Sequence, residues 1–192
     1  MVDFTLTEEQ QRLQELVRKF AQREIAPVAA ELDREQRFSQ EIVDKYYEIG
    51  LLHSHVPEEY GGAGLSSLEG CIAAEELAAA CGGVRSYLGG NNLALTPLLI
   101  AGSPELKKEL LPKHCAGPNL AAFCLTEAEA GSDVASMRST AKRMGDEYVI
   151  NGTKQFITNG GVASLYSVFA SEQPELRNKG ISCFMVPAQT PG

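Results

Sequence analysis

Residues 123–133, FCLTEAEAGSD, decide the fold because an apolar run stops there in a small, polar, glycine-containing loop. Gly131 and the neighbouring alanines carry little or no side chain, so backbone N–H groups in such a loop can approach a ligand closely. Farther along, a second strand-like run ends in residues 156–160, FITNG, with an aromatic, a β-branched and a hydroxyl side chain. If the two strand ends lie side by side, they surround one site with an aromatic face, two threonine hydroxyls and free N–H groups. Such a site suits a flat heteroaromatic ligand with polar edges.

Near residue 120 the hydrophobic pattern changes from a helical to a strand period. Short strands are expected over residues 121–125, 137–144, 147–150, 153–158, 165–170 and 181–186. Their expected inward side chains are Val149, Phe156, Ile157, Val168, Phe169, Phe184 and Val186. The pattern predicts an α+β chain, with an N-terminal all-helical domain over residues 1–120 and a truncated antiparallel β domain over residues 121–192.

The residues before 120 read as a series of helices. Thr7 and Gln10 form a capping-box pattern, and Pro27 should kink or divide the helix that follows, with residues 28–33 continuing it. A second helix should begin after Ser39 and stop at Gly50. Beyond a loop over residues 51–64, further helices are expected near residues 67–80, over residues 84–101 with Pro97 interrupting, and from Pro104 until soon after Pro112.

The composition is that of an ordinary soluble globular protein, with 44% hydrophobic residues, 22% charged residues and a formal net charge of −8. This acidic balance argues against a nucleic-acid surface. No apolar run approaches the roughly 20 residues that are needed to cross a bilayer. The chain begins with Met1-Val2-Asp3 in a polar, acidic segment, which resembles neither a signal peptide nor a transit peptide. A cytoplasmic location is therefore expected, with no nucleic-acid partner and no membrane span.

Cysteine and histidine spacing gives no metal site. The cysteines contain no C-x-x-C pair and lie mostly in apolar surroundings, which favours buried, reduced thiols. They are Cys71, Cys81, Cys115, Cys124 and Cys183. His53, His55 and His114 have no matching ligand set, although His53 and His55 would share one face of an extended segment. The adjacent Glu58 and Glu59 are expected to be solvated surface groups.

Three segments together resemble one enzyme family. Residues 124–133, CLTEAEAGSD, and residues 151–160, NGTKQFITNG, are similar to the two flavin-contacting signatures of the acyl-CoA dehydrogenases. Residues 57–66, PEEYGGAGLS, support the same resemblance. The likeness covers essentially the whole chain but only about the first half of a family member.

The resemblance implies which residues contact FAD. These are Phe123, Cys124, Leu125, Thr126, Gly131, Ser132, Phe156, Ile157 and Thr158, and Ser132 is also implied to contact the acyl-CoA substrate. Two positions depart from the family pattern. Ala128-Glu129 stands in place of the usual Pro-Gly, which adds a carboxylate near an anionic cofactor, and Phe156 stands in place of the usual Trp, which reduces the stacking area.

The resemblance also implies a reaction in fatty acid metabolism. In the family, a glutamate removes the α-proton of an acyl-CoA thioester while the β-hydrogen leaves as hydride to N5 of the flavin. Electron-transfer flavoprotein or a similar acceptor then reoxidises the cofactor. The family's glutamate lies in a C-terminal helical domain, beyond the last residue here, so no catalytic residue is assigned. Glu127 belongs to the flavin loop and is not a substitute.

The chain is accordingly expected to be a fragment or a split-gene product that is inactive alone. Unpaired strand edges and apolar helix faces would favour aggregation, a homo-oligomer or a partner chain that carries the missing half.

Two alternatives stay open. One is a relative that oxidises a different substrate or passes electrons to oxygen. The other is a non-catalytic interaction module that keeps the fold without the flavin, and a flavin absorbance band in the purified protein would argue against it. The glycines and asparagines of residues 87–92 match the region that bounds the acyl pocket in the family. They would either shape that pocket or disturb the helix.

Overall fold

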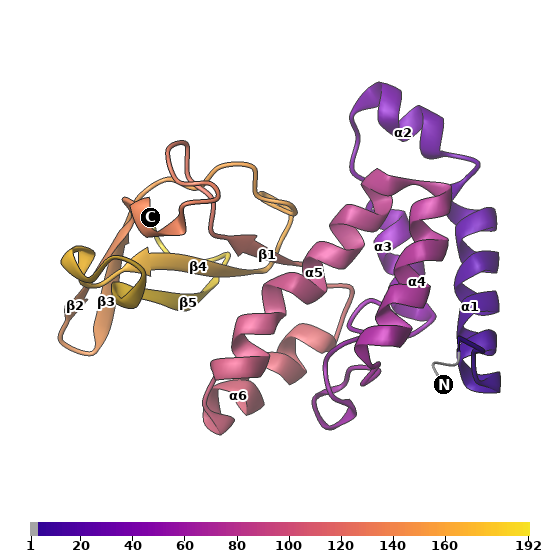
Figure 1. The fold of residues 1–192 in the computed structure, drawn as a ribbon, viewed down its shortest axis with the longest axis horizontal. Helices are drawn as coiled ribbons and strands as arrows, with labels where there is room; N and C mark the ends of the chain where they lie inside the picture. The colour runs from indigo at the N-terminus through magenta and orange to yellow at the C-terminus, as the bar shows by residue number, and fades with distance from the viewer. Residues whose placement is uncertain (1–3) are drawn as a thin grey trace.

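The computed structural model describes residues 4–192, and the start at Met1-Val2-Asp3 lies outside these residues. Within the described part, six α-helices precede a five-stranded sheet. α5 (Gly82–Ala101) lies between α1 to α4 and the sheet, and α6 lies beside the C-terminal end of α5 (Figure 1). The predicted order, a helical part followed by a β part, is confirmed.

The helices begin where the sequence signals place them. α1 (Glu8–Phe20) has the predicted capping box between Thr7 and Gln10. A turn of π-helix (Ala21–Ile25) then leads into Pro27, and α2 (Ala29–Glu35) follows, so the predicted division is confirmed. The remaining helices are α3 (Gln40–Glu48), α4 (Ser67–Ala80), α5 and α6 (Pro104–Cys115), with a short 3-10 helix (Glu58–Tyr60) in the predicted loop.

Pro97 does not interrupt α5, contrary to the prediction. A proline inside a helix removes one backbone hydrogen bond and crowds the preceding turn. Its neighbours Leu95 and Leu98 are 0% and 2% exposed, so a continuous α5 buries an apolar face that a broken helix would expose. Burial of that face offsets the local cost. The paired glycines and asparagines of residues 87–92 leave the helix continuous as well.

The sheet is mixed, which corrects the expected antiparallel arrangement. Its strands are β1 (Ala121–Cys124), β2 (Thr140–Met144), β3 (Glu147–Asn151), β4 (Leu165–Ser171) and β5 (Ile181–Pro187). β2–β3 and β4–β5 are antiparallel hairpins, but β1 runs parallel to β4, with Ala121 opposite Leu165. The β2–β3 hairpin and its flanking loops form the long crossover that a parallel pair requires.

The predicted strand over residues 153–158 is wrong. Phe156 has φ 57° and Asn159 has φ 67°, which is left-handed backbone that a strand cannot contain. Phe156 is 85% exposed and Val149 is 42% exposed, so neither belongs to the inward set. Ile157 does pack inward, against the small buried cluster of Ala122, Cys124 and Ala163.

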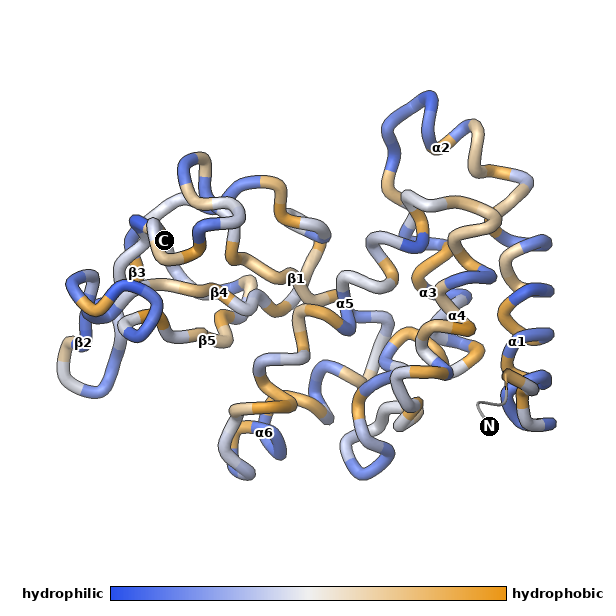
Figure 2. The backbone as a smooth tube through the Cα atoms, in the orientation of Figure 1, coloured by the Kyte–Doolittle hydropathy of each residue, from blue (hydrophilic) through white to orange (hydrophobic). Residues whose placement is uncertain are grey.

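Two larger hydrophobic cores fix the position of α5, one against the other helices and one against the sheet. The first fills the space among α1, α3, α4 and the start of α5, where the apolar sides of these helices face one another (Figure 2). The second joins helices to strands through Val56, Ala94, Leu95, Leu98, Leu111, Cys115, Ala121 and Leu165. Because Ala94 and Leu95 of α5 share this core with Ala121 of β1, the helix is held beside the loops that follow the strand.

Candidate functional site

A groove with a volume of about 460 Å³ lies between α5 and the two loops that the sequence singled out. Its α5 wall carries Arg85, Ser86, Gly89, Gly90 and Leu93, and its other wall carries Phe123, Thr126, Phe156 and Thr158. The structure therefore brings together four of the predicted site residues from two separate segments. A groove of this size can enclose a cofactor-sized ring system.

The aromatic side chains of the groove differ in their surroundings. Phe123 is half buried and packs against Phe169, with ring centroids 4.9 Å apart. Phe156 is 85% exposed, and its backbone adopts the left-handed conformation that is unfavourable for a bulky residue. An exposed aromatic held in a strained conformation is a common feature of ligand sites. The ring of Phe156 is thus available to stack on a planar ligand.

Asn159 holds the second loop against α5 and β1. Its Nδ2 donates to the carbonyl oxygens of Tyr87 and Ala121, each at 3.0 Å, and the residue is 8% exposed. A Cβ on Gly90 would lie 2.9 Å from Thr158 Cγ2, so a larger residue at this position would force Thr158 or the helix to shift. Neither anchoring role was predicted from the sequence, because each depends on two elements far apart in the chain.

The first loop is fixed by a buried ion pair. Glu127 Oε1 lies 2.8 Å from Lys154 Nζ, and the two side chains are 7% and 10% exposed. The backbone N–H of Arg138 donates to Glu127 Oε2 at 2.6 Å, and that of Ser139 donates to Oε1 at 3.0 Å. Burial by itself would raise the pKa of the Glu127 carboxyl, but these hydrogen bonds together lower it to about 2. Glu127 is therefore a charged structural anchor of the first loop.

Several predicted site residues lie outside the lining of the groove. Cys124 is 5% exposed in the small cluster with Ala122, and burial raises the pKa of its thiol to about 11. Gly131 and Ser132 lie on the exposed part of the first loop, and Leu125 is half buried beside it. Glu129 pairs with Arg138 at the surface, so its negative charge is already compensated.

The histidines form no metal site, and the described residues contain no group of three or more His, Cys, Asp or Glu side chains that could hold a metal ion. His53 and His55 lie in a turn and point to different surroundings, which corrects the extended segment expected for them. His53 is buried beside Asn91 and Gly117, whereas His55 contacts the Ser54 hydroxyl at 3.2 Å. In residues 4–192 all five cysteines are free thiols, and two of them are buried.

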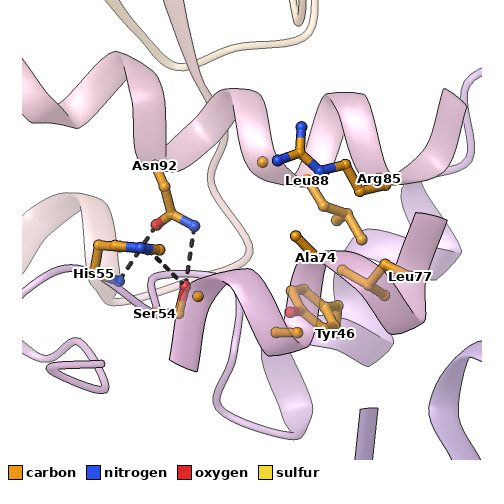
Figure 3. A pocket seen from close by; sticks show the side chains of 11 residues that line it. Tyr46, Ser54, His55, Ala74, Leu77, Arg85, Leu88 and Asn92 are labelled. Atoms are coloured by element: carbon orange, nitrogen blue, oxygen red, sulfur yellow. Dashed lines mark hydrogen bonds between the residues drawn. The ribbon is translucent and has the colours of Figure 1, made fainter. Parts of the chain in front are cut away.

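A second, smaller cavity of about 90 Å³ lies on the other side of Arg85 and Gly89, among α3, α4 and α5. Ser54, His55 and Asn92 form a hydrogen-bonded polar end, and Leu77, Leu88 and Ala74 form an apolar end (Figure 3). Sequence reasoning pointed to residues 87–92 in this helix but missed Arg85, Ser86 and Leu93. Their spacing along one helix face was the only available signal.

Within residues 4–192, none of the helices has the length and apolar character that a membrane span requires.

Two family models match the chain. The N-terminal domain of acyl-CoA dehydrogenase matches residues 7–118, and the middle domain of acyl-CoA dehydrogenase matches residues 122–192. The probable acyl-CoA dehydrogenase FadE25 of Mycobacterium tuberculosis is 43% identical over 183 residues, which is 95% of this chain and 47% of the relative. The chain thus spans about half the length of the curated relatives it matches.

Solved structures agree with these matches. Butyryl-CoA dehydrogenase from Megasphaera elsdenii superimposes with a TM-score of 0.92 and 35% identity, covering 100% of this chain and 51% of that one. A glutaryl-CoA dehydrogenase from Mycobacterium smegmatis in complex with FADH2 gives a TM-score of 0.87 and 32% identity, covering 97% of this chain and 47% of that one. Because the two family models together match nearly the whole sequence, the chain belongs to the acyl-CoA dehydrogenase family.

Proposed function

We propose that this chain forms the flavin-facing part of an FAD-dependent enzyme that removes hydrogen from the α and β carbons of an acyl-CoA thioester. The observation that supports this proposal is the groove beside α5, in which Phe123, Thr126, Phe156 and Thr158 meet. In this proposal, the domain of residues 1–120 supplies the helical wall of the groove, and the domain of residues 121–192 supplies the cofactor loops.

The side chains of the groove fit a flavin. Phe156 offers an exposed ring for stacking, and Thr126 and Thr158 offer hydroxyl groups for the polar edge of the ring system. When bound, FAD supplies the acceptor for the hydride that leaves the β-carbon. In the proposal, Cys124, Leu125, Gly131, Ser132 and Ile157 complete the cofactor contacts, and Ser132 also contacts the acyl-CoA.

The carboxylates of the cofactor loops do not supply the base for α-proton removal. Glu127 is bound to Lys154 and to two backbone N–H groups, and Glu129 is paired with Arg138. We propose that a carboxylate from another part of the whole protein, or from a partner chain or second copy, serves as the base. Electron-transfer flavoprotein or a similar acceptor is the proposed electron partner.

Replacing Phe156 with alanine should weaken FAD binding by about 1 kcal/mol, a roughly fivefold rise in the Kd, because the stacking face is lost. Thr158→Val should weaken it by about 0.5–1.5 kcal/mol through the loss of one hydrogen bond. Titration of the purified chain with FAD, followed by flavin fluorescence, measures both effects. Phe4→Ala is the matched control, because Phe4 is 89% exposed and lies outside the groove. Equal FAD affinity in all three variants and the parent would overturn the assignment.

A further inference from the structure

Thr158 lines the groove, but other residues hold it there. Its backbone and its hydroxyl form no hydrogen bond with any residue of the described range 4–192. The side chain is exposed, and its methyl carbon Cγ2 faces the backbone of α5 at Gly90, where an added Cβ would lie 2.9 Å from it. Because the methyl group faces the helix, the hydroxyl on the same Cβ points elsewhere and is free to bond a ligand. The position of this hydroxyl therefore depends on the residues around Thr158.

Asn159 ties the backbone next to Thr158 to two other elements. Its Nδ2 donates to the Tyr87 carbonyl in α5 and to the Ala121 carbonyl at the start of β1, each at 3.0 Å. The carbonyl of Asn159 accepts from the backbone N–H groups three and four residues later, at 3.1 and 3.0 Å. These four bonds converge on one residue that is 8% exposed. Asn159 is thus the fixed point of the second loop, one position from Thr158.

α5 both pulls the second loop inward and limits its approach. The pull comes from side-chain amides at Ala121, because Asn91 of α5 accepts from its N–H at 2.9 Å and Asn159 donates to its carbonyl. The limit is the contact between the Gly90 backbone and the Thr158 methyl group. Two opposing constraints of this kind define one separation between the α5 wall and the second loop.

We propose, resting on the proposed function, that Asn159 and Gly90 are positioning residues that place the Thr158 hydroxyl against the polar edge of the flavin. Asn159 acts from outside the lining of the groove, and Gly90 acts by the close approach that its missing side chain permits. The strength of a hydrogen bond depends steeply on distance and angle. A small shift of Thr158 should therefore change the affinity and the redox potential of the bound cofactor, which a role in stability alone would not do.

The first test replaces Asn159 with glycine. Glycine adopts the left-handed backbone of this position, with φ 67°, without strain, so the variant isolates the loss of the amide. Titration with FAD should show a Kd raised about three- to tenfold, the range expected when one hydrogen bond weakens. The midpoint potential of the bound FAD should shift with the same sign as in Thr158→Val. Ser103→Ala removes the N-cap of α6 outside the groove, so it should lower stability but leave the Kd and the potential unchanged.

Double variants identify the residue through which Asn159 acts. In a Thr158→Val background, Asn159→Gly should change the Kd for FAD less than about 1.5-fold, because the hydroxyl that it positions is already absent. In a Phe156→Ala background, Asn159→Gly should keep its full effect, because the exposed Phe156 ring makes its contact independently.

Gly90→Ala tests the same constraint from the side of the helix. The new methyl group should push Thr158 away from α5 and raise the Kd for FAD about threefold or more. Alanine is a better helix former than glycine, so the free energy of unfolding should not fall. Gly83→Ala is the matched control, because it makes the same change in the first turn of α5, outside the groove, where the nearest atom, Cys81 Sγ, is 3.8 Å away.

A third measurement needs no FAD. In the chain with ¹³C-labelled threonine methyl groups, the resonance that disappears in Thr158→Val belongs to Thr158. Asn159→Gly and Gly90→Ala should both shift this resonance, because each changes the contact between the methyl group and α5. Gly83→Ala should leave it in place.

The outcomes separate this inference from the proposed function. An unshifted Thr158 resonance in both variants would overturn the positioning role, whether or not the chain takes up FAD. A shifted resonance with an unchanged Kd and potential would show that Thr158 moves without facing the cofactor, and would also overturn the role. The same holds if Asn159→Gly has an equal effect with and without the Thr158 hydroxyl. A parent chain that takes up no FAD would overturn the proposed function, and this inference with it.

Discussion

Replacing Asn91 with leucine should lower the free energy of unfolding by about 3–4 kcal/mol. Asn91 of α5 is fully buried, and its side chain forms hydrogen bonds with groups on separate elements. Its Oδ1 accepts from the Ala121 N–H at 2.9 Å and from His114 Nε2 at 3.1 Å, and its Nδ2 donates to the Leu52 carbonyl at 3.0 Å. Leucine has a similar volume and excludes water, so these partners would stay buried without hydrogen bonds.

Chemical denaturation of the chain measures this loss. Asn92→Leu is the matched control, because Asn92 is the next residue of the same helix, is half buried and makes one short side-chain bond, to Ser54 Oγ at 3.0 Å. Asn92→Leu should lower the free energy of unfolding by about 1 kcal/mol. Similar losses in the two variants would show that Asn91 is no more important than an ordinary polar residue of α5.

The same network makes the fold sensitive to acid. Asn91 Nδ2 lies 3.2 Å from His53 Nδ1. Because the amide nitrogen can only donate, His53 Nδ1 must accept, and His53 Nε2 then donates to the Gly117 carbonyl at 3.0 Å. Burial, and then the proximity of His53, lower the pKa of His114 to about 3, and burial lowers the pKa of His53 against the opposing effect of the Gly117 carbonyl. Both histidines are therefore mainly neutral at pH 7 in the folded protein.

Stability should consequently fall as the pH drops below 6.5, the ordinary imidazole pKa. Below that pH the unfolded chain binds protons that the folded chain does not, and for His114 this difference persists until the pH approaches about 3. Each histidine contributes at most about 1.4 kcal/mol per pH unit to the slope. The free energy of unfolding should be measured between about pH 7 and about pH 5, because most carboxyl groups stay ionised in that range. His114→Gln keeps a donor for Asn91 and should reduce the slope, and an unchanged slope would contradict this account.

Local sequence signals predicted the helices well. Capping residues such as Thr7, Ser39 and Ser66 bond to their own helices within a few residues, so the information is local. The errors arose where tertiary contacts prevail. Pro97 stays helical because its neighbours are buried on both sides, and the parallel pairing of β1 with β4 depends on segments more than forty positions apart.

The candidate site was predictable in composition but not in geometry. The aromatic and hydroxyl residues of the two loops meet in one groove, as the sequence suggested. The strand that was expected to carry Phe156 is instead a left-handed turn, and this turn is what exposes the ring. The sequence did not predict the whole α5 wall, because Arg85 and Ser86 line the groove only when the helix is packed against β1. Asn159 likewise reads as a turn residue until its bonds to Tyr87 and Ala121 are seen.

Replacing Glu127 with glutamine should lower the free energy of unfolding by about 3 kcal/mol, because the buried Lys154 ammonium would lose its counter-charge. Lys154 Nζ donates to the Leu125 carbonyl at 3.1 Å and to Glu127 Oε1 at 2.8 Å, so it ties the first loop to the segment before Phe156. The pKa of Glu127 is about 2 in the fold against an ordinary value of 4.5. The contribution of the ionised Glu127 to the free energy of unfolding is therefore fully present above pH 4.5 and is lost as the pH falls towards 2.

Glu129→Gln supplies the control for this prediction. Glu129 lies two positions away in the same loop, but its side chain is 62% exposed and that of its partner Arg138 is 75% exposed, so its loss should change stability by less than about 1 kcal/mol. A double-mutant cycle with Lys154→Met completes the experiment, because removing both charges should be less damaging than the sum of the single changes. The groove should respond in parallel, with Glu127→Gln weakening FAD binding under conditions in which the chain is still folded. Additive losses in the cycle, or equal losses for Glu127→Gln and Glu129→Gln, would show that the buried pair does not hold the first loop in place.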